Sequence, residues 1–184
     1  ERERYTALLM DALPEGAEVL DLGCGAGVPT TKALAERFAV TGVDLSAEQL
    51  ALARQNVPGA RFIQSDMVAL DLPPGSLDGV VAFYAFIHVP RGEQPALLQK
   101  IASWLRPGGL LVMSMGTHPG EADVDDFFGV PMYWSGFDAE TNRRMVADAG
   151  LEIVTAQEET ADEFGDAVTF LWVVARKPAD EPAQ

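Results

Sequence analysis

Apolar and polar residues alternate with two different periods along most of the chain. Short apolar runs predict strands over residues 18–22, 40–43, 61–64, 79–85 and 110–115. Around these runs, helical spacing and capping signals predict helices over residues 3–12, 30–37, 47–55, 93–105 and 138–149. The run from 79 to 85 is almost unbroken, which is typical of a strand buried on both faces of a parallel sheet.

The last part of the chain follows a different order. Residues 116–136 predict a long loop, and strands over 151–156 and 167–175 then follow each other without a helix between them. Alternating strands and helices favour a parallel sheet with helices on both faces, and the final pair can form an antiparallel hairpin at one edge. The sequence therefore predicts one doubly wound α/β domain over residues 1–177, followed by a flexible tail over 178–184.

Composition and charge narrow the classes of partner. The net charge of −15 and the scattered lysines and arginines disfavour nucleic acid, so we expect a small-molecule partner. The apolar runs are too short to span a bilayer, and the charged start of the chain lacks a secretory pattern, so no membrane association is expected. The single cysteine excludes an internal disulfide and a cysteine metal site, so we expect no metal and a cytoplasmic location. We expect a monomer or a homodimer.

A glycine-rich turn, GCGAG, follows the first predicted strand. In doubly wound sheets, ligands bind beyond the carboxyl ends of the strands. A dinucleotide fingerprint would need a glycine where Val28 stands, whereas Asp44 ends the second strand, where an acid can accept hydrogen bonds from ribose hydroxyls. The pattern indicates a nucleoside held by its ribose without a pyrophosphate. The alternative is a purely structural turn, with Asp44 acting only at the start of the next helix.

Four stretches of the chain resemble the class I S-adenosylmethionine (SAM) dependent methyltransferases, in particular their small-molecule group. They are VLDLGCGAG, VTGVDLS, RFIQSDMVALDLPPGSLDGVVAFYAFIHVP and LRPGGLLVMSM, which together reach from Val19 to Met115. The resemblance implies a Rossmann-like, doubly wound, seven-stranded sheet that is mostly parallel, with an antiparallel C-terminal edge hairpin. It also implies SAM as cofactor and S-adenosylhomocysteine as its product.

The same resemblance implies roles for individual residues around the cofactor. The acid of the first strand and the glycine turn face the amino-acid part, and Asp44 holds the ribose. The adenine is met by Leu45, by Asp66 at its amino group and by the backbone of Met67, while the backbone of Phe83 contacts the methionine part. The complete predicted cofactor set is Asp21, Gly23, Cys24, Gly25, Gly27, Asp44, Leu45, Gln49, Asp66, Met67 and Phe83. For Cys24, a small residue that fits the turn is favoured over a nucleophile.

The sequence indicates the residues around the methyl acceptor less specifically than those around the cofactor. Methyl transfer from a sulfonium depends more on positioning the acceptor than on a particular side chain. His88, Tyr84 and His118 follow the fourth and fifth strands and are the catalytic candidates. His88 is the preferred general base because imidazole exchanges protons near neutral pH; otherwise it caps the following segment. An aromatic cluster either roofs a substrate pocket or fills the core: Met132, Tyr133, Trp134 and Phe137.

These observations predict an enzyme that moves a methyl group from SAM to an O, N or C nucleophile of a small metabolite. The alternative is a SAM-binding protein of the same fold that is non-catalytic or regulatory. Aminopropyl transfer is disfavoured because the segment FYAFIHVP after the fourth strand is apolar rather than acidic.

Overall fold

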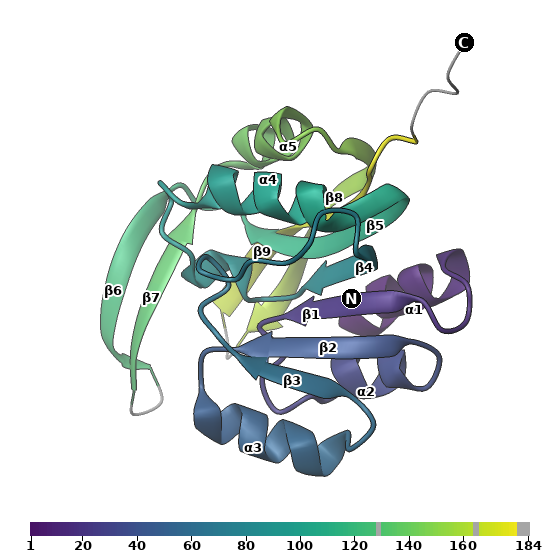
Figure 1. The fold of residues 1–184 in the computed structure, drawn as a ribbon. Helices are drawn as coiled ribbons and strands as arrows, with labels where there is room; N and C mark the ends of the chain where they lie inside the picture. The colour runs from purple at the N-terminus through teal and green to yellow at the C-terminus, as the bar shows by residue number, and fades with distance from the viewer. Residues whose placement is uncertain (128–129, 164–165, 180–184) are drawn as a thin grey trace.

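A seven-stranded sheet forms the centre of the computed structural model, which describes residues 1–127, 130–163 and 166–179 (Figure 1). The strand order is β3-β2-β1-β4-β5-β9-β8. Neighbours from β3 to β5 run parallel, whereas β9 is antiparallel to both β5 and β8. The strands are β1 (Glu18–Leu22), β2 (Ala39–Asp44), β3 (Arg61–Gln64), β4 (Leu77–Ala82), β5 (Leu105–Gly116), β8 (Glu152–Glu163) and β9 (Asp166–Arg176). This arrangement confirms the predicted fold class.

Two apolar clusters cover the two faces of the sheet. Leu9 of α1 and Leu34 of α2 belong to one cluster, whereas Ile101 of α4 and Val146 of α5 belong to the other. Successive residues of each central strand enter opposite clusters, as the two-residue period of a strand requires. The helices are α1 (Arg2–Ala12), α2 (Thr30–Ala35), α3 (Ala47–Asn56), α4 (Gln94–Trp104) and α5 (Ala139–Asp148). Their bounds agree with the predicted helices to within two residues.

The predicted long loop over residues 116–136 is wrong. Strands β6 (Gly120–Phe127) and β7 (Val130–Gly136) form an antiparallel hairpin that stands beside the main sheet (Figure 1). Acidic residues and Pro131 conceal the hairpin in the sequence, because both are rare in central strands. In a two-stranded ribbon each strand keeps one unpaired edge, and Pro131 lies where the β6–β7 register shifts, so its missing N–H is tolerated.

Strand ends also differ from the prediction. Strand β4 ends at Ala82 rather than at residue 85, and a 3₁₀ turn, η1 (Phe86–His88), follows. Strand β5 begins at Leu105 and includes Pro107 and its two following glycines within a register irregularity. Residues 180–184 of the predicted tail lie outside the described residues, so the tail and the 1–177 boundary stay predictions. No helix among the described residues is long and apolar enough to cross a membrane.

Candidate active site

The glycine turn after β1 has the backbone conformation that only glycine adopts freely. Gly23, Gly25 and Gly27 have φ values of 73°, 54° and 77°. A Cβ atom on Gly23 would lie 2.3 Å from the Cβ of Ala85, so this glycine is required for packing. At Gly25, the nearest atom to such a Cβ would be Oε1 of Gln49, at 3.7 Å, so a bare and open backbone surface remains. The turn thus offers room for a ligand against its middle glycine, which fits the implied cofactor.

Asp44 joins the glycine turn to the helix that follows β2. Its Oδ2 accepts a hydrogen bond from the Gly25 N–H at 2.8 Å, and its Oδ1 accepts one from the Ser46 N–H at 2.9 Å. Ser46 in turn caps α3 by accepting a bond from the Gln49 N–H. Each carboxylate oxygen keeps a further lone pair for a hydroxyl donor. Asp44 therefore has the structural role at the helix start and retains capacity to bind a ribose.

Asp21 is a buried carboxyl group at the end of β1, with 3% of its surface exposed. Its Oδ2 accepts a 2.6 Å hydrogen bond from the Thr31 hydroxyl. Burial raises the pKa of Asp21 to about 6, against the lowering effects of the Thr31 bond and of the positive charge on Arg2. Asp21 is thus ionised at neutral pH and would be stabilised further by a cationic ligand group.

The thiol of Cys24 lies within the same turn. Burial raises the pKa of Cys24 to about 12, and the negative charges of Asp21 and Asp44 act in the same direction. Because the thiolate is the nucleophilic form, a thiol that stays protonated is unreactive. The structure supports the small-residue interpretation of Cys24.

The residues assigned to adenine lie at the neighbouring strand ends. Leu45 directly follows β2 and is 70% exposed, an unusual setting for a large apolar side chain. Asp66 follows β3, is exposed, and accepts a hydrogen bond from the Val68 N–H at 2.9 Å. Met67 is half-buried, with its methyl carbon 3.7 Å from the position of a Cβ on Gly23. The ends of β1, β2 and β3 thus gather the predicted cofactor residues along one edge, here called the cofactor edge.

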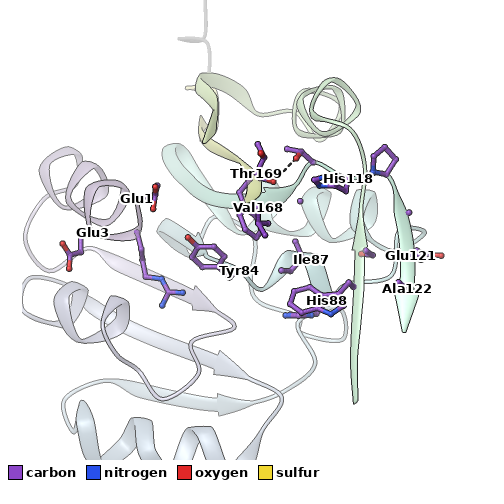
Figure 2. Close-up of a pocket in the computed structure, with 18 of the residues that line it drawn as sticks. Glu1, Glu3, Tyr84, Ile87, His88, His118, Glu121, Ala122, Val168 and Thr169 are labelled. Atoms are coloured by element: carbon purple, nitrogen blue, oxygen red, sulfur yellow. Dashed lines mark hydrogen bonds between the residues drawn. The ribbon is translucent and has the colours of Figure 1, made fainter. Parts of the chain in front are cut away.

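A cavity of about 1290 Å³ opens beside the cofactor edge, between α1 and the β6–β7 hairpin (Figure 2). The three catalytic candidates, Tyr84, His88 and His118, all line this cavity. The chain contains two histidines, so both of them lie in this one place. The structure therefore brings together Tyr84 and His88, which follow β4, and His118, which follows β5.

Tyr84 reaches the cavity through an unusual backbone conformation. Its φ is 57°, in the left-handed region, and its N–H donates a 2.8 Å hydrogen bond to the buried Ser114 hydroxyl. The ring stands edge-on against Phe170 and Trp172, with centroids 4.9 and 5.5 Å away. The preceding Phe83 is buried against Trp172, which leaves its backbone for the predicted contact with the methionine part.

His88 is held in one tautomer by the hairpin. Its Nδ1 lies 2.8 Å from the backbone oxygen of Tyr133. A carbonyl can only accept, so Nδ1 carries the proton, and Nε2 of the neutral ring is the acceptor. The ring also packs against Trp134, with a centroid distance of 4.7 Å. The arrangement leaves His88 able to accept a proton at Nε2.

The predicted aromatic cluster is divided between two environments. Trp134 lines the cavity, but Met132, Tyr133 and Phe137 are not among its lining residues. Tyr133 donates its hydroxyl to Glu121 across the hairpin at 2.7 Å, and the Phe137 ring lies 4.0 Å from the guanidinium carbon of Arg91. Tyr133 and Trp134 separate because neighbouring residues of a strand point to opposite faces.

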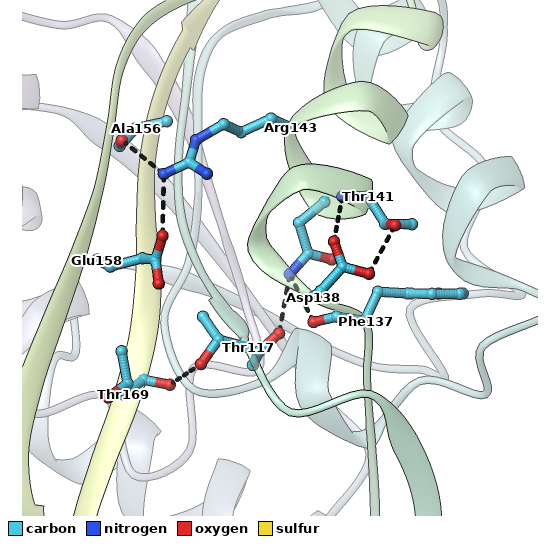
Figure 3. A network of polar contacts seen from close by, with 10 residues as sticks. Thr117, Phe137, Asp138, Thr141, Arg143, Ala156, Glu158 and Thr169 are labelled. Carbon is cyan, nitrogen blue, oxygen red and sulfur yellow. Dashed lines mark hydrogen bonds and ion pairs between the residues drawn. The ribbon is translucent and has the colours of Figure 1, made fainter.

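Buried hydrogen bonds fix the hairpin to the body of the domain. The Ser135 hydroxyl donates to the carbonyl of Val89 and accepts a 2.8 Å bond from the Gln94 amide. At the base of the hairpin, the buried Asn142 amide donates to the Gly116 carbonyl at 2.8 Å, and the Thr117 hydroxyl donates to the Thr169 carbonyl (Figure 3). The cavity wall is therefore an integral part of the domain.

Sequence reasoning missed the contribution of α1 to the cavity. Arg2 and Glu3, from the first turn of α1, line it together with Glu1 and with Thr169 of β9. No local sequence pattern indicates that these residues line the cavity, because their position depends on how the two ends of the chain pack together. Among the described residues, no group of three or more His, Cys, Asp or Glu side chains could hold a metal ion.

Comparison with known proteins identifies the family. Residues 19–109 match the family model of a methyltransferase domain. The chain belongs to the class I SAM-dependent methyltransferases, as the sequence predicted, and the cofactor of this family is SAM.

Individual relatives show what the chain is similar to. It is 37% identical over 129 residues to trans-aconitate 2-methyltransferase from Delftia acidovorans, which covers 66% of this chain and 47% of the relative. It is 30% identical over 176 residues to 2-methyl-6-phytyl-1,4-hydroquinone methyltransferase from Synechocystis, covering 92% and 54%. The chain thus spans about half the length of these curated relatives.

A solved structure of similar fold also contains the product of the cofactor. It is 1,6-didemethyltoxoflavin-N1-methyltransferase from Burkholderia thailandensis with bound 1,6-didemethyltoxoflavin and S-adenosylhomocysteine. Its TM-score is 0.75 at 23% identity, over 96% of this chain and 78% of that one. This similarity supports the fold.

Proposed function

We propose that the chain transfers the methyl group of SAM to an O, N or C nucleophile of a small molecule bound in the cavity. The main support is the placement of His88, whose Nδ1 is fixed by Tyr133 and whose Nε2 is an acceptor in a cavity beside the glycine turn. The two curated relatives named above are methyltransferases named for an organic acid and a hydroquinone. We expect a cytoplasmic monomer or homodimer that acts without nucleic acid or membrane.

In this proposal the cofactor edge binds and orients. Asp44 accepts the ribose hydroxyls, Leu45 lies against the adenine, and Asp66 accepts from the adenine amino group, with the backbones of Met67 and Phe83 as further contacts. The turn, with Gln49 beside it, presents its bare backbone, and Asp21 pairs with the ammonium group. SAM, when bound, supplies a methyl carbon already activated by a sulfonium.

The cavity residues prepare the acceptor. Nε2 of His88 takes the proton that an O, N or C nucleophile loses when it is methylated. Tyr84 and Trp134 would enclose the acceptor with aromatic surface and exclude water, which would orient its nucleophile toward the cofactor. His118 lies on the loop before β6 and lines the same cavity, where it would contact the acceptor.

The first experiment combines binding with turnover. Titration calorimetry with SAM, S-adenosylhomocysteine and NAD tests the cofactor, and we expect binding of the first two alone. Transfer of labelled methyl from SAM is then measured with trans-aconitate, a hydroquinone and phosphoethanolamine as acceptors. Binding without transfer to these or a wider panel of acceptors would favour the non-catalytic alternative.

Substitution of His88 tests its role as base. His88→Asn keeps an N–H donor for the Tyr133 carbonyl but removes the acceptor nitrogen, so transfer should fall by roughly 10²- to 10⁴-fold. The affinity for S-adenosylhomocysteine should stay unchanged, because the cofactor edge is untouched. His118→Asn is the matched control and should cost less. Equal rates for the wild type and His88→Asn would refute the base assignment.

A further inference from the structure

One arginine lies among the residues that line the cavity. Arg2 is the sole lysine or arginine among the described residues that line it, whereas Glu1, Glu3 and Glu121 contribute carboxylates. Glu121 is already engaged by the Tyr133 hydroxyl and the Arg91 N–H. In a chain with 28 acidic and 13 basic residues, a guanidinium placed at a cavity is a specific feature rather than part of a basic surface.

The Arg2 guanidinium has an aromatic contact and no ion pair among the described residues. Its central carbon lies 4.8 Å from the ring centroid of Tyr84. Arg4, two residues further along α1, is instead paired with Glu159. Neighbouring residues on a helix do not face each other, and Figure 2 shows Glu3 pointing away from Tyr84. The N–H donors of Arg2 are therefore available to a ligand.

Arg2 also connects the cavity with the glycine turn. With Pro29 and Thr30 it lines a second, smaller cavity of about 120 Å³ at the start of α2. The Thr30 side chain is buried, and its hydroxyl has no hydrogen-bond partner among the described residues. The charge of Arg2 also reaches Asp21, where it lowers the pKa of that buried carboxyl group against the effect of burial. Arg2 therefore lies between the cavity and the start of α2, within electrostatic reach of the buried Asp21.

We infer that Arg2 is a carboxylate-binding residue at this junction. A guanidinium presents paired N–H donors that match the two oxygens of a carboxylate, and the Tyr84 ring contacts the guanidinium at the cavity. The carboxylate belongs either to the amino-acid part of the cofactor, with Asp21 facing the ammonium group, or to an acidic acceptor. The acceptor case rests on the proposed function.

Three ligands distinguish the two sources in titration calorimetry. S-adenosylhomocysteine carries the amino-acid part, 5′-methylthioadenosine lacks it, and trans-aconitate is a carboxylate without a nucleoside. Arg2→Gln should weaken binding of at least one carboxylate ligand by roughly tenfold or more and leave 5′-methylthioadenosine unchanged. A loss confined to S-adenosylhomocysteine assigns the cofactor carboxylate, and a loss confined to trans-aconitate assigns the acceptor.

Control variants separate recognition from a general effect of charge or folding. Arg4→Gln removes the same charge two residues away and should leave all three affinities unchanged. Arg2→Lys keeps the positive charge but not the paired N–H donors of a guanidinium, so it should retain part of the wild-type affinity for the carboxylate ligands. The inference is overturned if Arg2→Gln binds both carboxylate ligands with wild-type affinity. It is also overturned if the substitution lowers the affinity for 5′-methylthioadenosine as much as the affinity for the carboxylate ligands. If Arg2→Gln loses affinity for S-adenosylhomocysteine but the wild type methylates no acceptor, Arg2 is still a carboxylate-binding residue, whereas the proposed function is rejected.

Discussion

At the cofactor edge, a single β1-α2-β2 unit supplies two carboxylates and a turn of three positive-φ glycines, joined by short hydrogen bonds. The cavity beside it is lined instead by side chains from α1, the β4 and β5 ends, the hairpin and β9. The first region depends on backbone shape within a short stretch of chain. The second depends on how distant elements pack, so its ligand can change without altering the cofactor edge.

The strongest test of this contrast is a substitution in the turn. Gly23→Ala places a methyl group 2.3 Å from the Cβ of Ala85 in a left-handed backbone, so we expect a loss of about 3 kcal/mol or more in the free energy of unfolding. Binding of S-adenosylhomocysteine should be lost with it. Denaturant unfolding and calorimetry measure both effects.

Gly75→Ala is the matched control for that experiment. Gly75 also has a positive φ, of 63°, but a Cβ there would meet nothing within 4 Å. Gly75→Ala should lower the free energy of unfolding by about 1–2 kcal/mol, because only the backbone conformation is unfavourable for alanine. Cofactor affinity should be unchanged. Equal losses in the two variants would show that close packing in the turn is unimportant.

A smaller effect is expected where the hairpin is fixed. Ser135→Ala leaves the buried Gln94 amide short of an acceptor and should lower the free energy of unfolding by about 2 kcal/mol. Hydrogen exchange in β7 should accelerate, while affinity for S-adenosylhomocysteine stays constant. Ser103→Ala, at an exposed hydroxyl on α4, should change stability by about 0.5 kcal/mol or less. A loss of cofactor affinity in Ser135→Ala would show that the cofactor edge and the cavity are not independent of each other.

The smallest effect concerns pH. Because burial raises the pKa of Asp21 to about 6, its carboxylate is neutralised as pH falls through 6 and can no longer pair with an ammonium group. Affinity for S-adenosylhomocysteine should therefore fall by about tenfold between pH 7.5 and pH 5. The affinity of 5′-methylthioadenosine, which lacks the ammonium group, should change little. In Asp21→Asn the affinity for S-adenosylhomocysteine should be lower and independent of pH, and a persistent slope would assign the titration to another group.

The two regions also differ in how well the sequence predicts them. The turn and Asp44 are recognisable because their chemistry depends on glycine spacing within one strand–helix–strand unit. The hairpin was missed because, within the described part of the chain, its strands pair with each other and with no further strand, and because they tolerate Pro131. The contribution of Arg2 was missed because it requires α1 to lie beside Tyr84, which no local pattern specifies.

Trp172 of β9 connects the beginning, middle and end of the chain. Its ring stacks on Tyr5 at 4.6 Å and supports Tyr84. Strand β9 enters the sheet between β5 and β8, so both of its edges are filled by strands made earlier. During synthesis, the ribosome releases the glycine turn long before Trp172, which supports the Tyr84 ring at the cavity. The strands that carry the cofactor edge are thus synthesised first, whereas the cavity can be completed only after β9 has been synthesised.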